Sequence, residues 1–149
     1  QKTAYEISLG LVGSEMCIRD SNNPCLFCNS KTSGVAHENE LAYASYDTYP
    51  VSNLHCLIIP KRHLSDYFDL TNDELIACND LIKKMKIEIT AKDKTVKAFN
   101  IGTNAGKISG QSIMHCHIHL IPRRDGDVEN PQGGVRSVIP KNQHYKRKI

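Results

Sequence analysis

His115-Cys116-His117-Ile118-His119 is the stretch that decides the fold of this chain. Three of the seven histidines stand here at alternate positions, and the residues between them are apolar. In a β-strand, successive side chains point to opposite faces of the sheet. The spacing therefore predicts a strand with three imidazoles along one face and an apolar face toward the core. The alternative is a half-exposed strand that carries its histidines by chance. In that alternative the histidines have no function.

The whole chain has the size and composition of a single globular domain. It has 149 residues, a formal net charge of +3 and six cysteines. The sequence contains no apolar run long enough to span a bilayer, and its N-terminus lacks the pattern of a secretion signal. We therefore expect a cytoplasmic protein whose cysteines are thiols or metal ligands. The basic residues at 141–148 are typical of a solvated end, so we expect neither a nucleic acid nor a membrane as partner.

Residues 1–21 differ from the rest of the chain. They form a weakly apolar stretch without a clear period, interrupted by glycine and serine. Within them, Met16-Cys17-Ile18-Arg19-Asp20 resembles one reading frame of a translated sequencing adapter. We expect a leader without function, either disordered and non-native or an ordinary variable segment. A single domain is then expected over residues 22–149.

A Cys-x-x-Cys knuckle, Cys25 and Cys28, follows this leader in a turn-prone setting. The spacing lets two thiolates reach one metal ion from a tight turn. A redox pair is a second interpretation, and two unconnected thiols are a third. The knuckle alone supplies half of a metal site.

Strand and helix signals follow in a simple order. Residues 41–46 and 54–59 are typical of two strands in a hairpin, and residues 96–101 predict a third strand. Thr71 and Glu74 have the spacing of a capping box, which predicts the start of a helix. Apolar residues then recur at steps of three and four, at Leu75, Cys78, Ile82, Met85 and Ile89. The pattern predicts an α+β domain, with an antiparallel sheet of about five strands and one main helix packed on it.

Together these motifs resemble the histidine triad (HIT) superfamily. Its signature, His-φ-His-φ-His-φ-φ with φ apolar, matches residues 115–121, which Gly110-Gln111-Ser112 precedes and Pro122-Arg123 follows. The resemblance runs from about Cys25 to Tyr145 and includes residues 50–63 and 126–136. It implies a HIT-like fold of the branch that contains a zinc knuckle and resembles dinucleoside polyphosphate hydrolases. Family members commonly have small residues such as Pro-Gly before the hairpin histidine, where this chain has Asn53-Leu54.

The resemblance also implies a reaction. The enzyme would be a hydrolase or nucleotidyltransferase acting on the α-phosphate of a nucleotide ester, an anhydride such as a dinucleoside polyphosphate, or a phosphoramidate. His117 would attack phosphorus and form a nucleotidyl-histidine intermediate, which requires a neutral imidazole nitrogen. His119 would contact the phosphate or help to protonate the leaving group. Gln111 and Ser112 complete the expected catalytic set. The expected nucleotide- and phosphate-binding residues are Asp47, His55, Asn104, Gln111, Ser112 and His119, with Asp47 at the ribose hydroxyls.

A structural zinc and a homodimer are two further implications of the resemblance. The zinc ligands would be Cys25, Cys28, His63 and His115, a Cys₂His₂ set that leaves no open position for substrate. In related homodimers the sheets join, and the C-terminal segment of one subunit approaches the site of the other. Residues 126–136 are the candidates for that role and for substrate selection.

Two alternative functions stay open beside this one. The three histidines could be ligands of a catalytic metal in a metal-dependent hydrolase. The domain could also be a non-catalytic module that binds or senses nucleotides. The intact histidine at the nucleophile position, His117, counts against the second alternative.

Overall fold

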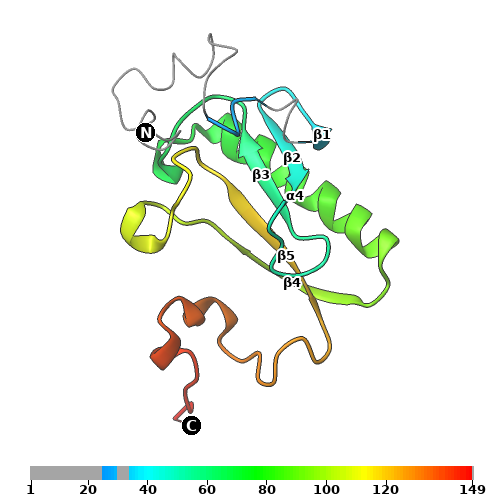
Figure 1. The fold of residues 1–149 in the computed structure, drawn as a ribbon, viewed down its shortest axis with the longest axis vertical. Coiled ribbons are helices and arrows are strands. Elements are labelled where there is room, and N and C mark those ends of the chain that lie inside the picture. The colour runs from blue at the N-terminus through cyan, green and yellow to red at the C-terminus, as the bar shows by residue number, and fades with distance from the viewer. Residues whose placement is uncertain (1–24, 30–33, 149) are drawn as a thin grey trace.

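A single five-stranded antiparallel sheet organises the chain in a computed structural model that describes residues 25–29 and 34–148 (Figure 1). The strands lie in the order β1-β2-β3-β5-β4, and helix α4 packs across one face, mainly against β2 and β3. This is the α+β architecture that the sequence predicts. The elements are β1 Val35–Glu38, β2 Ala42–Tyr46, β3 Cys56–Pro60, η1 Tyr67–Asp69, α4 Asn72–Lys92, β4 Val96–Gly102, η2 Lys107–Ser109, β5 Ile118–Arg124, η3 Gly134–Val138 and η4 Pro140–Asn142.

β2 and β3 pair as the predicted antiparallel hairpin, in a register that places Ala44 opposite Ile58. Every residue of β3 is buried because this strand is central in the sheet. The loop between the two strands carries Asp47 and His55. Leu54 in this loop has a φ of +70°, in the left-handed region that favours glycine. This is the position at which the resembling family commonly has a small residue.

Helix α4 begins at the predicted capping box. The Thr71 hydroxyl accepts a hydrogen bond from the Glu74 N–H at 3.1 Å, and the Glu74 carboxylate accepts one from the Thr71 N–H at 2.9 Å. Arg62 donates two hydrogen bonds to the same carboxylate and holds the pKa of Glu74 below its usual range. The apolar stripe of the helix is buried against the sheet, with Leu81 in the core and Ile82 at its margin. Its buried apolar residues are Cys78, Leu81, Met85 and Ile89.

The histidine motif enters the sheet later than the sequence predicts. β5 begins at Ile118, so His119 is the one motif histidine that lies on the strand. His115 and His117 lie in the segment before it, where the Cys116 N–H donates to the Leu64 carbonyl at 2.7 Å. This hydrogen bond ties the segment to the loop after β3 instead of to a neighbouring strand. The predicted row of three imidazoles on one strand face is therefore wrong.

β1 is a strand that the sequence patterns did not indicate. It pairs antiparallel with β2, and its register is irregular between Val35 and His37. Because the burial of its four residues does not alternate, periodicity gives no signal there. With β1, the sheet reaches the expected five strands.

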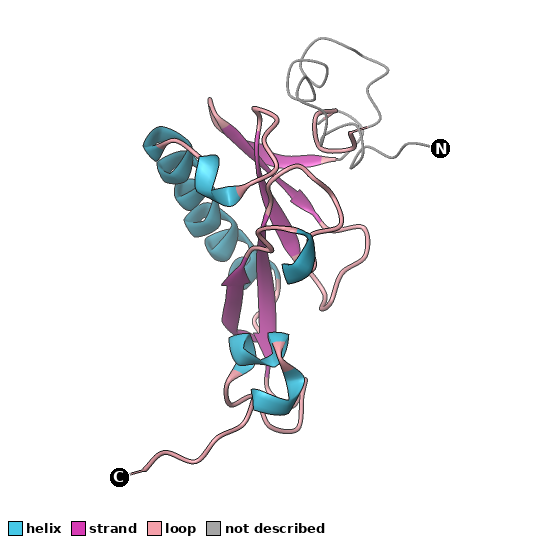
Figure 2. Cartoon of the chain, turned by 90° about the vertical axis from the view of Figure 1, so that its left-hand side faces the viewer, coloured by secondary structure: helices cyan, strands magenta, loops and turns pink. Residues whose placement is uncertain are grey.

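Residues 126–145, which we call the cap segment, continue the chain after β5. They contain η3 and η4, and η3 contacts β4. In Figures 1 and 2 the cap segment lies at the lower end of the molecule, beside β4 and β5. It therefore stands next to the strand that carries His119.

The predicted leader, residues 1–21, lies outside the described residues. Residues 22–24, 30–33 and 149 of the predicted domain at 22–149 lie outside them too. Of the helices that the structure describes, none combines the length and the apolar character that a membrane crossing requires.

Candidate active site and metal centre

Four side chains of the kind that bind metals meet at one point. Cys25 and Cys28 come from the N-terminal turn, His63 from the loop after β3, and His115 from the segment before β5. The Nδ1 atoms of the two histidines lie 3.2 Å apart. Each cysteine Sγ lies between 3.3 and 3.6 Å from both of these nitrogens. The structure thus brings together all four residues that the resemblance assigns to a metal.

These distances fit a tetrahedral zinc ion. Bonds of about 2.0 Å to nitrogen and about 2.3 Å to sulfur put tetrahedral donors about 3.3 Å (N to N) and about 3.5 Å (N to S) apart. The His115 Nε2–H donates to the Pro60 carbonyl at 2.8 Å, which leaves the Nδ1 lone pair for a metal. Burial lowers the pKa of His115 to about 3 and raises the pKa of the Cys25 thiol. A neutral imidazole has a lone pair that can bind a cation. A buried thiolate is stabilised by a bound cation.

His117 is next to this cluster in the sequence but is not one of its possible metal ligands. Its Nδ1–H donates to the carbonyl of His115 at 2.8 Å, so the lone pair of the neutral ring is on Nε2. The ring packs edge-on against Phe27 with ring centres 5.1 Å apart, and the residue is buried. Burial lowers the pKa of His117, which keeps the ring neutral at neutral pH. This is the state that a nitrogen nucleophile requires.

A chain of hydrogen bonds fixes the ring of His119. The Val51 N–H donates to His55 Nδ1 at 3.1 Å, so the hydrogen of a neutral His55 ring is on Nε2. That nitrogen lies 3.0 Å from His119 Nδ1 and donates to it, which leaves an Nε2–H on His119. Burial, together with the nearby His117 and His55, lowers the pKa of His119 to about 4. His119 is therefore a neutral hydrogen-bond donor. Asp47 Oδ2 lies 3.7 Å from His55 Nδ1, at the start of this chain of bonds.

The loop at 104–112 is shaped by the side chain of Gln111. Its amide oxygen accepts from the Gly106 N–H at 2.9 Å, and its amide nitrogen donates to the carbonyls of Ser65 and Ile113. The residue is buried, so its side chain holds the loop closed from within. This loop also carries two other expected phosphate contacts: Ser112 is exposed, and Asn104 is half-buried.

The three motif histidines do not converge on one metal position. Among the described residues, two groups of side chains have donor atoms close enough together for a metal ion, and neither group contains His117. One group is the Cys₂His₂ cluster with His115; the other is Asp47, His55 and His119. In the second group, His55 Nε2 and His119 Nδ1 already bond to each other. The arrangement gives no support to a catalytic metal held by all three histidines.

Comparison with known proteins agrees with this geometry. The model of the HIT domain family matches residues 29–126, which is more than half of the chain. The chain belongs to the HIT family. An uncharacterized HIT-like protein of Mycoplasma genitalium is 35% identical over 111 residues, which cover 70% of this chain and 77% of that protein. A Zn-bound histidine triad family protein from Mycobacterium smegmatis has a similar structure, with a TM-score of 0.64 at 27% identity, over 71% of this chain and 79% of that one.

Two further relatives of this HIT protein have names that state a reaction. An adenosine 5′-monophosphoramidase of Saccharomyces cerevisiae is 33% identical over 105 residues, 68% of this chain and 63% of that protein. An asymmetrical bis(5′-nucleosyl)-tetraphosphatase of Schizosaccharomyces pombe is 33% identical over 112 residues, 74% of this chain and 60% of that protein. Nucleotide hydrolases are thus homologues of this chain at about one third identity.

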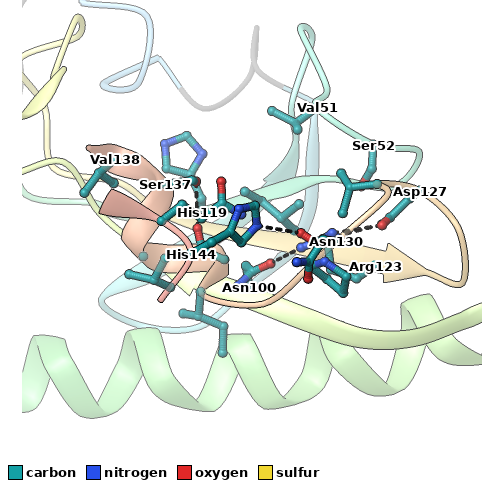
Figure 3. A pocket seen from close by; sticks show the side chains of 18 of the residues that line it. Val51, Ser52, Asn100, His119, Arg123, Asp127, Asn130, Ser137, Val138 and His144 are labelled. Atoms are coloured by element: carbon teal, nitrogen blue, oxygen red, sulfur yellow. Dashed lines mark hydrogen bonds and ion pairs between the residues drawn. The ribbon is translucent and has the colours of Figure 1, made fainter. Parts of the chain in front are cut away.

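Some residues that shape the site in this HIT protein had no role in the sequence analysis. The Thr103 hydroxyl donates to the His117 carbonyl at 2.6 Å, which holds the backbone of the candidate nucleophile. Val51 orients the His55 ring through its backbone N–H, and a backbone contact leaves no pattern in the side chains of the sequence. Arg123, four residues after His119 on β5, pairs with Asp127 and Asn100 (Figure 3). The Pro122-Arg123 pair after the motif and the segment 126–136, which contains Asp127, belong to the resemblance, but neither predicts these contacts.

Proposed function

We propose that this protein is a nucleotidyl hydrolase that forms a nucleotidyl-histidine intermediate on His117. The observation that carries the proposal is the hydrogen bond from His117 Nδ1 to the backbone carbonyl of His115, at 2.8 Å. It fixes the tautomer that has its lone pair on Nε2, and burial keeps the ring neutral. A neutral, oriented and partly desolvated imidazole nitrogen is well suited to attack an electrophilic phosphorus.

The proposed reaction has two displacements at phosphorus. In the first, His117 Nε2 forms a bond to the α-phosphorus, and the bond from phosphorus to the leaving atom breaks with its electron pair on that atom. An anionic phosphate beside His119 raises the pKa of this ring, so that His119 can take up a proton and pass it to the leaving atom. In the second, water attacks the same phosphorus while the bond from phosphorus to His117 Nε2 breaks with its electron pair on nitrogen. One proton of the water returns to His119, and a nucleoside monophosphate is released. A nucleotidyltransferase would use another acceptor in place of water.

The other expected residues support the same chemistry. Phosphoryl-group transfer depends on positioning and on neutralising the charge of the non-bridging oxygens. His119, Ser112 and Asn104 offer hydrogen-bond donors for those oxygens, and His55 orients His119. Gln111 acts by holding the loop that carries these donors. Asp47 remains the proposed partner of the ribose hydroxyls.

The names of the relatives agree with attack at a nucleotide phosphorus. One name refers to a phosphoramidate of adenosine 5′-monophosphate and the other to a dinucleoside tetraphosphate. Both kinds of compound join a nucleoside to an α-phosphorus that carries a leaving group. The two names support attack at the α-phosphorus, and the two kinds of compound differ in the leaving group.

We also propose that zinc occupies the Cys₂His₂ cluster. With four protein ligands, the ion would supply a structural link and no position for substrate. It would join Cys25 and Cys28 to the segment that carries His117. The Zn-bound structural neighbour supports this assignment.

A homodimer through β4 is the proposed assembly. β4 forms one edge of the sheet and has seven residues, whereas β1 at the other edge has four and an irregular register. A long unpaired edge can continue a sheet into a second copy. The resemblance to homodimers in which the sheets join agrees with an interface at a sheet edge, and the greater length of β4 favours this edge over β1.

His117→Ala tests the proposed function. We expect the release of nucleoside monophosphate to fall by at least about 10⁴-fold, because the nucleophile is lost. Calorimetry should still detect binding of a nucleoside monophosphate, since the loop and His119 remain. His37→Asn is the matched control: it changes a histidine of β1 and should keep full activity. Turnover by His117→Ala at the wild-type rate would contradict the proposal.

A further inference from the structure

The loop between β2 and β3 brings two competing groups to one nitrogen of His55. The backbone nitrogen of Val51 lies 3.1 Å from His55 Nδ1, and a carboxylate oxygen of Asp47 lies 3.7 Å from the same atom. An N–H requires a lone pair on Nδ1, whereas a carboxylate favours a hydrogen there. Burial lowers the pKa of His55, and a neutral ring has one hydrogen for its two nitrogens. The group that occupies Nδ1 therefore selects the tautomer of His55.

The tautomer of His55 determines that of His119. His55 Nε2 and His119 Nδ1 lie 3.0 Å apart, so a single hydrogen lies between them. With the Val51 N–H at Nδ1 of His55, this hydrogen belongs to His55, and His119 carries its own hydrogen on Nε2 as a donor. With the Asp47 carboxylate at that position, the direction reverses, and His119 Nε2 becomes an acceptor. An acceptor cannot hydrogen-bond to the anionic oxygens of a phosphate.

The packing of side chains does not hold the Val51 N–H in place. Val51 is 74% exposed, and Tyr49 is 87% exposed. The His55 N–H donates to the Ser52 carbonyl at 3.0 Å, which closes a turn within the loop. This turn fixes the residues of the loop to one another but does not join them to β5, the strand that carries His119. The position of the N–H therefore depends on contacts between the loop and β5.

The Ser52 hydroxyl makes such a contact in the residue next to Val51. It donates to the Pro122 carbonyl of β5 at 2.7 Å. The pairing of β3 with β5 ends at Cys56 and Leu120, so this carbonyl lies beyond the last residue pair of the two strands. The hydroxyl thus joins the loop to β5 where backbone pairing no longer does.

A second contact holds the outer side of the same loop. The Arg124 guanidinium donates to the Asn53 carbonyl at 3.0 Å, and it donates to the Asp93 carboxylate at 2.8 and 3.1 Å. Asn53 follows Ser52 in the chain, whereas Val51 precedes it. Ser52 is therefore the anchor nearest to the N–H that faces His55.

We propose that Ser52 is a positioning residue that makes His119 a hydrogen-bond donor. Its bond to β5 holds the Val51 N–H at His55 Nδ1 and thereby excludes the Asp47 carboxylate from that nitrogen. Val51, Ser52 and His119 line one cavity (Figure 3), so the chain of hydrogen bonds that begins at the loop ends at a surface that a ligand can reach. The inference rests on the proposed function for the phosphate that His119 meets, and it adds the residue that sets the tautomer.

Nuclear magnetic resonance of the purified protein measures the tautomers directly. With histidine labelled by nitrogen-15, two-bond correlation spectra at mildly alkaline pH show which nitrogen of each neutral ring carries the hydrogen. We expect the wild type to have its hydrogen on Nε2 in both His55 and His119. In Ser52→Ala, at least about half of the His55 rings should carry the hydrogen on Nδ1, because the loop is no longer held. His119 should change in the same proportion.

Three further variants isolate the hydroxyl and the N–H. Ser52→Thr keeps a hydroxyl and should keep the wild-type tautomers. Val51→Pro removes the N–H and leaves Ser52 in place, and it should reverse both rings. Ser45→Ala is the matched control, because it makes the same change of side chain on β2 and loses a hydroxyl bond to the Gly34 carbonyl at 3.2 Å. It should keep the wild-type tautomers.

Binding of adenosine monophosphate connects the tautomers to the proposed site. Calorimetry at the same pH should give a Kd at least about twofold higher for Ser52→Ala and at least about fivefold higher for Val51→Pro, because only the donor form of His119 bonds to a phosphate oxygen. Ser45→Ala should bind as the wild type does. An unchanged Kd in a variant with reversed tautomers would overturn the proposed effect on the phosphate.

The tautomers are measured without substrate, so their outcome does not depend on turnover. Wild-type tautomers in Ser52→Ala or in Val51→Pro would overturn the inference. So would an equal reversal in Ser45→Ala, or a reversal in Ser52→Thr as large as that in Ser52→Ala. Absence of nucleoside monophosphate release by the wild type from nucleotide esters, anhydrides and phosphoramidates would instead overturn the proposed function, and it would leave the measured tautomers unchanged.

Discussion

The nitrogen that carries the hydrogen decides what each histidine of the motif can do. The Pro60 carbonyl takes the Nε2–H of His115 and leaves Nδ1 toward the cysteines, whereas the His115 carbonyl takes the Nδ1–H of His117 and leaves Nε2 free to react. Two backbone oxygens thus select opposite tautomers in residues two positions apart. His119 receives its tautomer from His55 instead. Metal binding, attack and hydrogen-bond donation are in this way assigned to different rings.

Cys25→Ser tests the metal assignment at this scale. We expect wild-type protein to contain about one zinc per chain and the variant to contain almost none, because one of four ligands is lost. The melting temperature should fall by at least about 5 °C, since bound metal stabilises the folded state. Mass spectrometry of the metal content and a thermal unfolding scan measure both effects. His37→Asn, which changes a histidine outside the cluster, should retain its zinc, and a zinc-free wild-type protein after metal-replete expression would refute the assignment.

The sequence predicts which four residues would bind the metal, but it does not predict the tautomers of the histidines. Cys25, Cys28, His63 and His115 follow from the resemblance, and the structure brings them together. The alternate spacing of the histidines suggested equal positions on one strand. The hydrogen bond from the Cys116 N–H to the Leu64 carbonyl keeps His115 and His117 outside the strand, and it depends on a loop far away in the sequence. Long-range backbone contacts of this kind have no signal in local periodicity.

Among the elements, those with strong periodicity or a defined cap were predicted well. The hairpin of β2 and β3, the start of α4 and the extent of β4 lie within a few residues of the predicted positions. β1 was missed because its burial does not alternate. The cap segment was recognised only as a motif, since η3 and η4 are short and mostly exposed. Its order comes from contacts with β4 and with Arg123.

β4 as a dimer edge gives a prediction at the scale of elements. Light scattering should report twice the chain mass of 16.7 kDa for the wild type. Ala98→Lys, at an exposed position of β4, should weaken the dimer at least about tenfold, because a twofold axis brings the two ammonium groups near each other. Asp80→Lys on the exposed side of α4 is the control and should leave the dimer intact. A monomeric wild type, or an unaffected Ala98→Lys dimer, would contradict this interface.

For the molecule as a whole, the proposed substrate site lies around the start of β5. The loop between β2 and β3 carries Asp47 and His55, and its residues Val51 and Ser52 line a cavity beside His119 together with residues of β4 and of the cap segment. The Cys₂His₂ cluster anchors the segment that leads into β5. The proposed nucleophile, His117, thus lies between the Cys₂His₂ cluster and the strand that carries His119.

The central claim is that His117 carries the nucleotide during turnover, and rapid quenching of the reaction tests it most directly. With an adenosine 5′-phosphoramidate labelled at phosphorus, we predict a burst of label on the protein that is stable to base and labile to acid, and that peptide mapping places on His117. His119→Ala should still form the labelled protein, at a lower rate, whereas His117→Ala should form none. Label on another residue, or turnover by the wild type without any labelled protein, would contradict the account.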